Sequence, residues 1–249
     1  MSRPSISAIV PTWNEERWLP SLLTRLQSQA DVGEIIVADN ESDDNTAVIA
    51  RSRGCAVVKG GLPAVGKNAG ARAATGEVLL FVDADVGVGN ENVAYLHARF
   101  SDPSCNLVYF RLLPHASTRS TRARNAYRFL DSVARTASRF NRPGLSAPLI
   151  AVRAEIFHRV GGFDEGISAA EDAEFIGRVA RVTGGVEYAR HPPLEISARR
   201  LSVEGSSYAA KSVLWATLRI FGSKASVFGY RWARYPAEVA AADPITDIH

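Results

Sequence analysis

Short apolar runs alternate with amphipathic stretches through the first hundred residues of the chain. The apolar runs predict four strands, at 6–10, 34–38, 56–58 and 78–82. The amphipathic stretches predict four helices, at about 15–29, 45–53, 67–74 and 91–100. Strands and helices that alternate at this spacing indicate a parallel sheet with right-handed crossovers. Ligands of such sheets bind beyond the carboxyl ends of the strands, so residues just after a strand are the first candidates for chemistry.

The pattern is less regular beyond residue 110. It predicts helices at about 118–140, from Ala154 onward, at 170–182 and at 208–228. It predicts strands at 149–152 and 186–189, with a further segment at 194–201 after His191-Pro192-Pro193, where His191 is expected in a loop. Gly184-Gly185 is expected to end the helix at 170–182. Because the chain has no internal repeat and no low-complexity linker, one mixed α/β domain is expected.

Composition narrows the class of protein. The chain has 249 residues, of which 46% are apolar and 22% charged, which excludes a disordered, collagen-like or small disulfide-rich protein. No apolar run reaches 18 residues, and the N-terminus lacks the apolar core of a secretory signal, so a cytoplasmic protein is expected. Cys55 and Cys105 form no metal or redox motif and are expected to be buried thiols.

The positive charge of the chain is local. The net charge is +3 and the pI about 9.0, values that suggest nucleic acid as a partner. Residues 1–110, however, carry 9 basic and 13 acidic groups, whereas residues 111–142 carry 8 Arg against Asp131 alone. The distribution argues against nucleic acid and indicates an anionic or phosphate-rich partner for the Arg-rich segment, with a solvated helix face as the alternative.

Two carboxylates follow the strand predicted at 78–82. Asp83 and Asp85 are separated by one residue, so in an extended chain their side chains point the same way and both could bind one hard divalent cation. The alternative is an ordinary polar turn after a strand. A D-x-D motif alone is weak evidence for a metal site. Its position directly after a predicted strand strengthens the interpretation.

The strand at 34–38 ends in the same manner, with Asp39 at its tip and a polar turn that opens the next helix. Asp39 could accept hydrogen bonds from a ribose or a base. Helix capping alone would explain Asp43, Asp44 and Asn45, but it does not explain Asp39.

Glu171-Asp172 opens the helix at 170–182 after the turn Gly161-Gly162-Phe163-Asp164. Acidic residues in a first helical turn are favoured by the helix dipole, which is one interpretation of the pair. The other is a general base that takes a proton from an attacking hydroxyl.

Two further motifs are incomplete. Residues 61–68 nearly match a phosphate-binding loop, but Asn68 stands where Ser or Thr should contact magnesium, so a nucleoside-triphosphatase is the weaker hypothesis. Residues 144–148 begin like the nucleophile turn of an esterase but end in Pro148 where Gly is required. The five His residues are scattered and indicate no metal site.

Taken in order, the motifs resemble those of family 2 glycosyltransferases of the GT-A type, over residues 5–200. The matching segments follow the predicted strands or open the predicted helices: 11–15, 39–46, 67–70, 83–85, 161–165 and 171–172. The resemblance implies a GT-A fold, with a Rossmann-like, mostly parallel central sheet flanked by helices. It implies a glycosyltransferase domain at 1–204, with a nucleotide-binding half (1–110) and an acceptor-binding half (111–204), followed by a helical C-terminal extension at 205–249.

The resemblance also implies the activity and its residues. The family transfers a sugar from a nucleotide diphosphate sugar, such as a UDP- or GDP-sugar, usually with inversion and with Mg or Mn as cofactor. Asp85 would be the main metal ligand with Asp83, and Asp172 the general base with Glu171 beside it. The donor site would comprise Pro11, Thr12, Asn14, Glu15, Asp39, Asn40, Ser42, Lys67, Asn68, Asp83 and Ala84. Asn40-Glu41 and Lys67 depart from the commoner Asp-Gly and Arg, which leaves the nucleobase open.

The acceptor side is less defined. Ser197-Ala198-Arg199-Arg200 resembles a Ser-x-Arg-Arg segment of some bacterial members, so Ser197, Arg199 and Arg200 are candidates for donor phosphates or the acceptor, with a structural ion pair as the alternative. The Arg-rich helix and the helix from Tyr208 could hold an anionic or lipid-linked acceptor at a membrane surface. The alternative for these helices is packing against the sheet or in a homodimer. A non-catalytic nucleotide- or sugar-binding protein on the same fold is the competing hypothesis for the whole chain.

Overall fold

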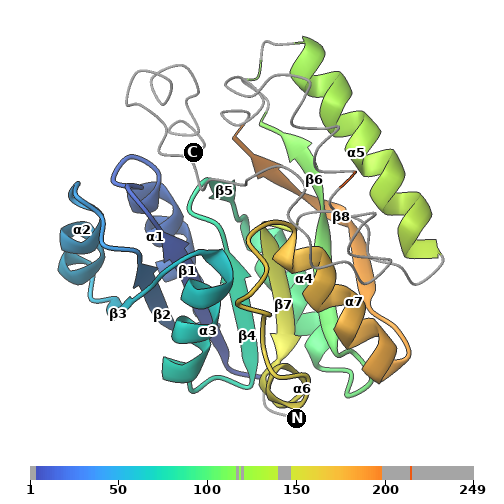
Figure 1. Ribbon diagram of the computed structural model, residues 1–249, viewed down its shortest axis with the longest axis horizontal. Helices are drawn as coiled ribbons and strands as arrows, with labels where there is room; N and C mark the ends of the chain where they lie inside the picture. Colours follow the sequence, from blue (N-terminus) through green and yellow to red (C-terminus); the bar gives the residue numbers. More distant parts are fainter. Residues whose placement is uncertain (1–3, 116–117, 119–120, 140–146, 198–213, 215–249) are drawn as a thin grey trace.

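The structure is a computed structural model that describes residues 4–115, 118, 121–139, 147–197 and 214. The described residues form one eight-stranded sheet with helices on both faces (Figure 1). The strands are β1 (Ile6–Thr12), β2 (Val32–Asp39), β3 (Ala56–Lys59), β4 (Val78–Val82), β5 (Val86–Gly87), β6 (Leu107–Pro114), β7 (Leu149–Arg153) and β8 (Glu187–Ile196). The helices are α1 (Leu19–Gln27), α2 (Thr46–Ser52), α3 (Pro63–Ala73), α4 (Asn90–Phe100), α5 (Thr121–Arg139), α6 (Ala154–Arg159) and α7 (Glu171–Thr183).

The sheet is parallel where the alternating pattern is regular. Its strand order is β3-β2-β1-β4-β7-β6-β8-β5, and the pairings among β3, β2, β1 and β4 are all parallel, as predicted. β7 enters between β4 and β6 and is antiparallel to both, while β6 and β8 run parallel to each other. The hydrophobic pattern does not predict β5 or β6. The carboxyl ends of β1, β2 and β4 therefore share one edge of the sheet, where the motifs lie.

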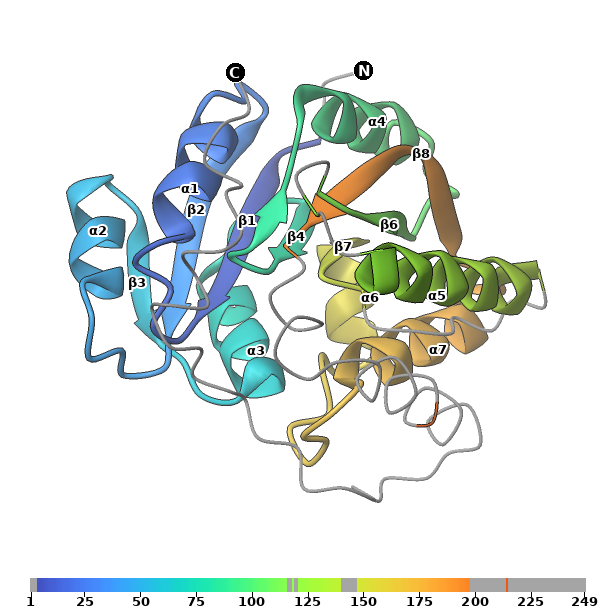
Figure 2. The same cartoon turned by 90° about the horizontal axis from the view of Figure 1, so that it is seen from above.

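Each face of the sheet has its own apolar core. Alternate residues of β4 point to opposite faces, so Val78, Leu80 and Val82 contact one core and Leu79 and Phe81 the other. The first core is covered by α1 and α4, and the second by α3, α6 and α7, as the view from above shows (Figure 2). The candidate residues on α3 and α7 are thereby brought to the same face of the sheet.

Three predicted boundaries are wrong. The first helix begins at Leu19, not at residue 15, because residues 14 and 15 are held in a loop that bonds to the start of α2. α3 begins at Pro63, four residues early, because proline suits a first helical turn. The strand predicted at 186–189 continues through residues 190–193 to Ile196 as one strand, β8, which contains His191 instead of leaving it in a loop, and residues 198–201 lie outside the described part. Residues 190–193 bulge opposite Arg111 of β6, and the bulge accommodates the two prolines.

Several predictions fall partly or wholly outside the described residues. The extension 205–249, with its predicted helix at 208–228, lies outside them apart from Leu214, and so do Arg199, Arg200 and residues 144–146. Cys55 and Cys105 are buried free thiols, as predicted. Gly184 ends α7, as expected, and it adopts the left-handed conformation (φ 79°). In the part of the chain that the structure describes, no helix has the length and apolar character needed to cross a membrane.

Candidate active site

Asp39 is held by hydroxyl groups at the carboxyl ends of β1 and β2. Its Oδ1 accepts hydrogen bonds from the Thr12 hydroxyl (3.1 Å) and the Ser42 hydroxyl (2.6 Å), and its Oδ2 accepts the Ser42 N–H (3.1 Å). The side chain is largely buried, and Thr12 is fully buried. The carboxylate is thus fixed at the strand tip, where a ligand is expected in a sheet of this kind.

The loop after β1 is tied to the loop after β2. The Asn14 N–H donates to the Ser42 hydroxyl (2.9 Å), and the Asn14 side-chain oxygen accepts the Asp43 N–H (3.0 Å). Asn14 adopts the left-handed conformation (φ 57°), which Asn tolerates better than most residues. The Asn40 N–H donates to the Thr12 carbonyl, and the Glu15 N–H to the Thr46 hydroxyl. These bonds give the strand tips a defined shape.

Asp83-Ala84-Asp85 forms a tight turn directly after β4. The Asp83 N–H donates to the Pro148 carbonyl (2.9 Å), and the Val86 N–H donates to the Asp83 carbonyl (3.3 Å). Asp85 is 2% exposed, and its carbonyl accepts the Ser197 N–H (3.3 Å). The turn is therefore connected to the segment before β7 and to the end of β8.

The D-x-D carboxylates suit a divalent cation that is shared with a substrate. Among the described residues, no group of three or more His, Cys, Asp or Glu side chains could hold an ion by protein ligands alone. Mg²⁺ commonly binds through one or two carboxylates, with substrate phosphates and water completing its coordination. Two carboxylates at the end of β4 would suit that mode better than a closed structural site.

Lys67 of α3 lies between the two carboxylates that open α7. Its Nζ donates to Glu171 Oε1 (3.0 Å) and to Asp172 Oδ1, and the Lys67 side chain is 3% exposed. The ammonium also lies 5.1 Å from the centre of the Phe163 ring. Asp172 Oδ2 accepts the Ala147 N–H (3.3 Å). The predicted base is therefore held from both sides.

Buried charges shift the pKa values in this cluster. Burial, opposed by Lys67 and reinforced by Glu171 and Asp83, raises the pKa of the Asp172 carboxyl from 3.8 to about 7. Burial lowers the pKa of the Lys67 ammonium, but the carboxylates of Asp172, Glu171 and Asp83 outweigh it and raise the pKa above its ordinary value. Asp83 contributes to both shifts, so the D-x-D turn and the start of α7 belong to one electrostatic site. A carboxylate with a pKa near 7 is well matched to general-base catalysis.

Asn68 holds the turn that precedes α7. Its side-chain nitrogen donates to the Phe163 carbonyl (2.9 Å) and to Glu165 Oε1 (2.9 Å), and its oxygen accepts the Phe163 N–H (2.9 Å). Gly162 has φ +69°, and a Cβ there would lie 2.7 Å from the Asn68 oxygen, so glycine is required. Because α3 begins at Pro63, residues 63–65 are helical where a phosphate-binding loop needs open backbone N–H groups, which argues against that hypothesis.

Ala170 immediately precedes Glu171 in the left-handed conformation, with φ 55° and ψ 35°. This conformation costs a residue with a Cβ roughly 1–2 kcal/mol, and such strain concentrates at functional sites. The sequence gives no signal for this strain, nor for the contact of the Ala147 N–H with Asp172. Both depend on how segments distant in the chain meet.

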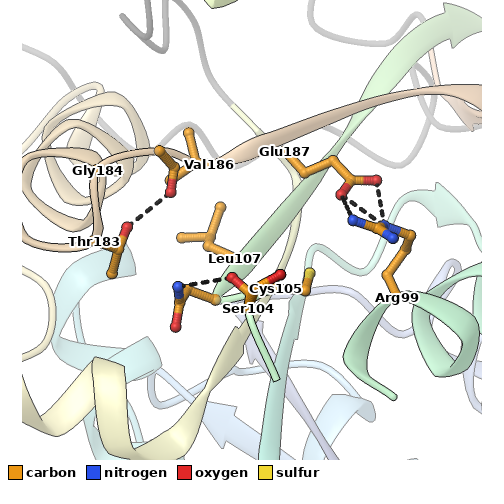
Figure 3. A pocket seen from close by; sticks show the side chains of 10 residues that line it. Arg99, Ser104, Cys105, Leu107, Thr183, Gly184, Val186 and Glu187 are labelled. Atoms are coloured by element: carbon orange, nitrogen blue, oxygen red, sulfur yellow. Dashed lines mark hydrogen bonds and ion pairs between the residues drawn. The ribbon is translucent and has the colours of Figure 1, made fainter. Parts of the chain in front are cut away.

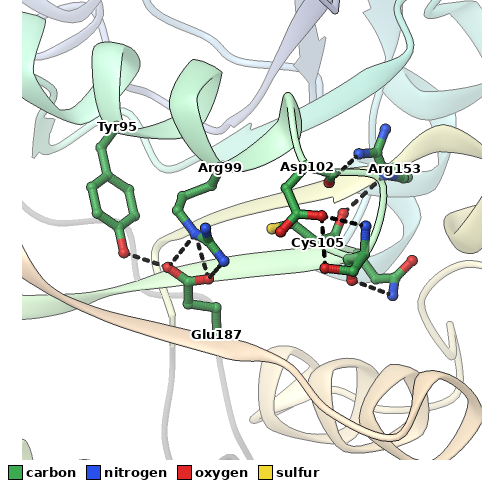
Figure 4. Close-up of polar contacts among 8 residues, drawn as sticks. Tyr95, Arg99, Asp102, Cys105, Arg153 and Glu187 are labelled. Carbon is green, nitrogen blue, oxygen red and sulfur yellow. Dashed lines mark hydrogen bonds and ion pairs between the residues drawn. The ribbon is translucent and has the colours of Figure 1, made fainter.

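A hollow of about 430 Å³ lies at the far end of α7, away from the predicted base. It is lined by residues that include Arg99, Cys105, Thr183 and Glu187 (Figure 3). The Glu187 carboxylate accepts hydrogen bonds from the Tyr95 hydroxyl and from Arg99 Nε (2.7 Å), so the charged groups in its wall bind each other (Figure 4). Thr183 is eleven residues after Asp172 along α7, a rise of about 16 Å, so the hollow does not belong to the same site.

Comparison with known proteins gives a family match. A model of glycosyl transferase family 2 matches residues 7–161. The 4,4'-diaponeurosporenoate glycosyltransferase of Staphylococcus haemolyticus is 41% identical over 97 residues, which are 35% of this chain. This chain spans only 26% of the length of that relative.

Solved structures match the fold over most of the chain. Glucosyl-3-phosphoglycerate synthase of Mycobacterium tuberculosis, in complex with Mn²⁺ and UDP-glucose, has a TM-score of 0.66 and 20% identity, over 91% of this chain and 82% of that protein. A mannosyltransferase of Pyrobaculum calidifontis, in complex with GDP-mannose and Mn²⁺, has a TM-score of 0.58 and 18% identity, over 89% and 74% of the two chains. The predicted GT-A architecture is confirmed.

Proposed function

This chain belongs to glycosyl transferase family 2, and we propose that it transfers a sugar from a nucleotide diphosphate sugar to an acceptor hydroxyl with inversion. The bond from the anomeric carbon to the diphosphate breaks, and a bond to the acceptor oxygen forms on the opposite face. The acceptor proton passes to Asp172, and the nucleoside diphosphate leaves. The observation that supports this function best is the single electrostatic site formed by the D-x-D turn and Asp172.

The donor nucleoside is proposed to bind at the tips of β1 and β2. Asp39 is fixed there by Thr12 and Ser42, and a fixed carboxylate can accept hydrogen bonds from a ribose or a base. Pro11, Asn14, Glu15 and Asn40 would line the same pocket. Lys67 and Asn68 would close it from α3, with Asp83 and Ala84 at the diphosphate side.

Asp85, with Asp83, would hold Mg²⁺ or Mn²⁺ beside the donor diphosphate. When bound, the ion would neutralise the charge that develops on the leaving phosphates. The N–H of Ser197 donates to the Asp85 carbonyl. Arg199 and Arg200 lie outside the described residues, and the family resemblance is the reason to propose them as contacts of the phosphates or the acceptor.

A nucleotide panel tests donor class, metal and activity together. UDP, GDP and dTDP would each be added with and without Mn²⁺, and the melting temperature of the protein recorded. We expect one nucleotide to raise the melting temperature, and to raise it further when Mn²⁺ is present, because a ligand that binds only the native state stabilises that state. UDP and GDP are the first choices because the two matched structures contain UDP-glucose and GDP-mannose. No shift with any nucleotide would contradict the proposed donor class.

The acceptor is proposed to be anionic or lipid-linked and held near α5. Arg124, Arg128 and Phe129 lie exposed on this helix, whereas Asp131 is buried and paired with Arg111 (3.0 Å). A cationic face with an aromatic residue is typical of an interfacial helix, so the protein would bind peripherally at the inner face of a membrane. Packing of α5 in a homodimer is the alternative.

Liposome co-sedimentation tests this membrane contact. We expect the protein to sediment with anionic vesicles at low salt and to be released at high salt, because screening weakens the attraction of exposed arginines. Vesicles of zwitterionic lipid serve as the control. Absence of binding to anionic vesicles at low salt would exclude the contact, and a doubled mass in sedimentation without lipid would favour the homodimer.

A further inference from the structure

Lys67 joins the two halves of the candidate site. It lies on α3, whose backbone packs tightly on β1: a Cβ at Gly70 would lie 2.3 Å from Ile9 Cγ2. Its carboxylate partners lie on α7, more than a hundred residues further along the chain. Since helix α3 rests directly on the sheet, the Lys67 ammonium is a fixed reference point for the start of α7.

Both oxygens of Asp172 are bound by elements that are anchored on the sheet. Oδ1 accepts from Lys67, and Oδ2 accepts from the Ala147 N–H. Ala147 precedes β7, which pairs with β4, and the neighbouring Pro148 carbonyl binds the Asp83 N–H. The orientation of the Asp172 carboxylate is therefore set relative to the D-x-D turn.

The burial of Lys67 requires this arrangement. A buried ammonium is costly unless carboxylates and hydrogen bonds compensate it, and Lys67 has Glu171 and Asp172 within bonding distance. Two of its three N–H donors go to these groups, and among the described residues the third has no acceptor.

We propose that Lys67 is a positioning residue for the transfer reaction, which orients the Asp172 carboxylate from α3. This role rests on the proposed function, since it has meaning only if Asp172 is the base. It differs from donor binding alone, the role that the family resemblance implies for Lys67. A group that positions a base affects the chemical step, whereas a group that only binds donor affects substrate affinity.

The test compares Lys67→Met with wild type in the hydrolysis of UDP-glucose and GDP-mannose with Mn²⁺, where water replaces the unidentified acceptor. We expect kcat to fall about 100-fold, the typical cost of a misplaced catalytic group, while the donor KM changes less than about threefold. Arg72→Met is the matched control, since Arg72 is exposed on the same helix and its ion pair with Glu165 is 3.9 Å long. This control should keep both wild-type constants.

A second pair of variants shows whether Lys67 acts through Asp172. In an Asp172→Asn background, Lys67→Met should lower the residual rate no further, because residues that act as a unit are not additive. The positioning role would be overturned if Lys67→Met changed only KM. It would also be overturned if Lys67→Met lowered the residual rate by a further factor in the Asp172→Asn background.

Two further controls separate the possible failures. If Lys67→Met does not melt cooperatively, Lys67→Arg carries the test, because it keeps the charge but moves the donor groups, so kcat should fall while KM stays. An unchanged kcat in Lys67→Arg would then overturn the proposal. If wild type neither binds nor cleaves any donor of the panel, the proposed function itself fails. If wild type is active but the Lys67 variants change only KM, the proposed function stands and the positioning role fails.

Discussion

Asp172→Asn is expected to lower the rate of sugar transfer by about 10² to 10⁴-fold, the contribution that a positioned general base usually makes. Asparagine keeps the size of the side chain and can still accept a hydrogen bond, but it cannot take the acceptor proton. Lys67 keeps Glu171 as a partner, so the fold should tolerate the change. Binding of the nucleoside diphosphate with Mn²⁺, measured by calorimetry, should stay close to wild type, because Asp172 opens α7 whereas the nucleoside is proposed to bind at the tips of β1 and β2.

Glu155→Gln is the matched control, since Glu155 is an exposed acid in the first turn of α6. The pH profile gives an independent check. Because the pKa of Asp172 is raised to about 7, the base is protonated over much of the range from pH 4 to 7, where an ordinary Asp would be ionised. Wild-type kcat/KM should therefore fall as the pH falls through about 7, and Asp172→Asn should lose that dependence. Equal turnover by wild type and Asp172→Asn would favour the non-catalytic binding protein or a different base.

Asp85→Ala is expected to abolish the effect of Mn²⁺ on donor binding. Mutations of groups that only support a metal ligand typically lower metal affinity 10- to 100-fold, so loss of the main carboxylate should cost about 100-fold or more. In wild type, Mn²⁺ should tighten UDP or GDP binding, and in Asp85→Ala the affinity with Mn²⁺ should match the affinity in EDTA. Titration calorimetry with the nucleotide, with and without the ion, measures both values.

Asp102→Ala provides the comparison for Asp85, because Asp102 is an exposed aspartate that bonds locally to Ser104 (2.8 Å). It should keep the full response to Mn²⁺. If Asp85→Ala also keeps it, Asp85 is not a metal ligand.

Local pattern is sufficient to locate the carboxylates of the candidate site but not their partners. Asp39 and Asp83 stand at the ends of apolar runs, and Asp172 opens an amphipathic helix, so each can be placed from its neighbours in the sequence. The bonds that orient Asp172 join it to Lys67, 105 residues away, and to Ala147, 25 residues away. No periodicity encodes such contacts, which arise only when α3, α7 and β7 pack on one sheet.

The same limit explains what the sequence missed in the fold. The parallel half of the sheet follows from strands that alternate with helices, and the structure has it as predicted. β7 lies between β4 and β6, which are distant from it in the sequence, so local pattern cannot predict its place in the sheet. β6 carries Arg111 in an otherwise apolar run, which interrupts the strand pattern of that segment. In β8, Pro192 and Pro193 break the local strand signal, and only the bulge opposite β6 lets the strand continue through them.

The two edges of the sheet bear on how copies of this protein can associate. In the part of the chain that the structure describes, the outermost strands are β3, with four residues, and β5, with two. Short edge strands offer few open backbone groups, and β3 also ends in Lys59, a charged residue of the kind that discourages strand-to-strand pairing. Sheets of neighbouring molecules are thus poorly suited to merge into one, which protects the folded protein against edge-to-edge aggregation. Between the described parts of two copies, helices and loops therefore offer the better contact surface for a homodimer.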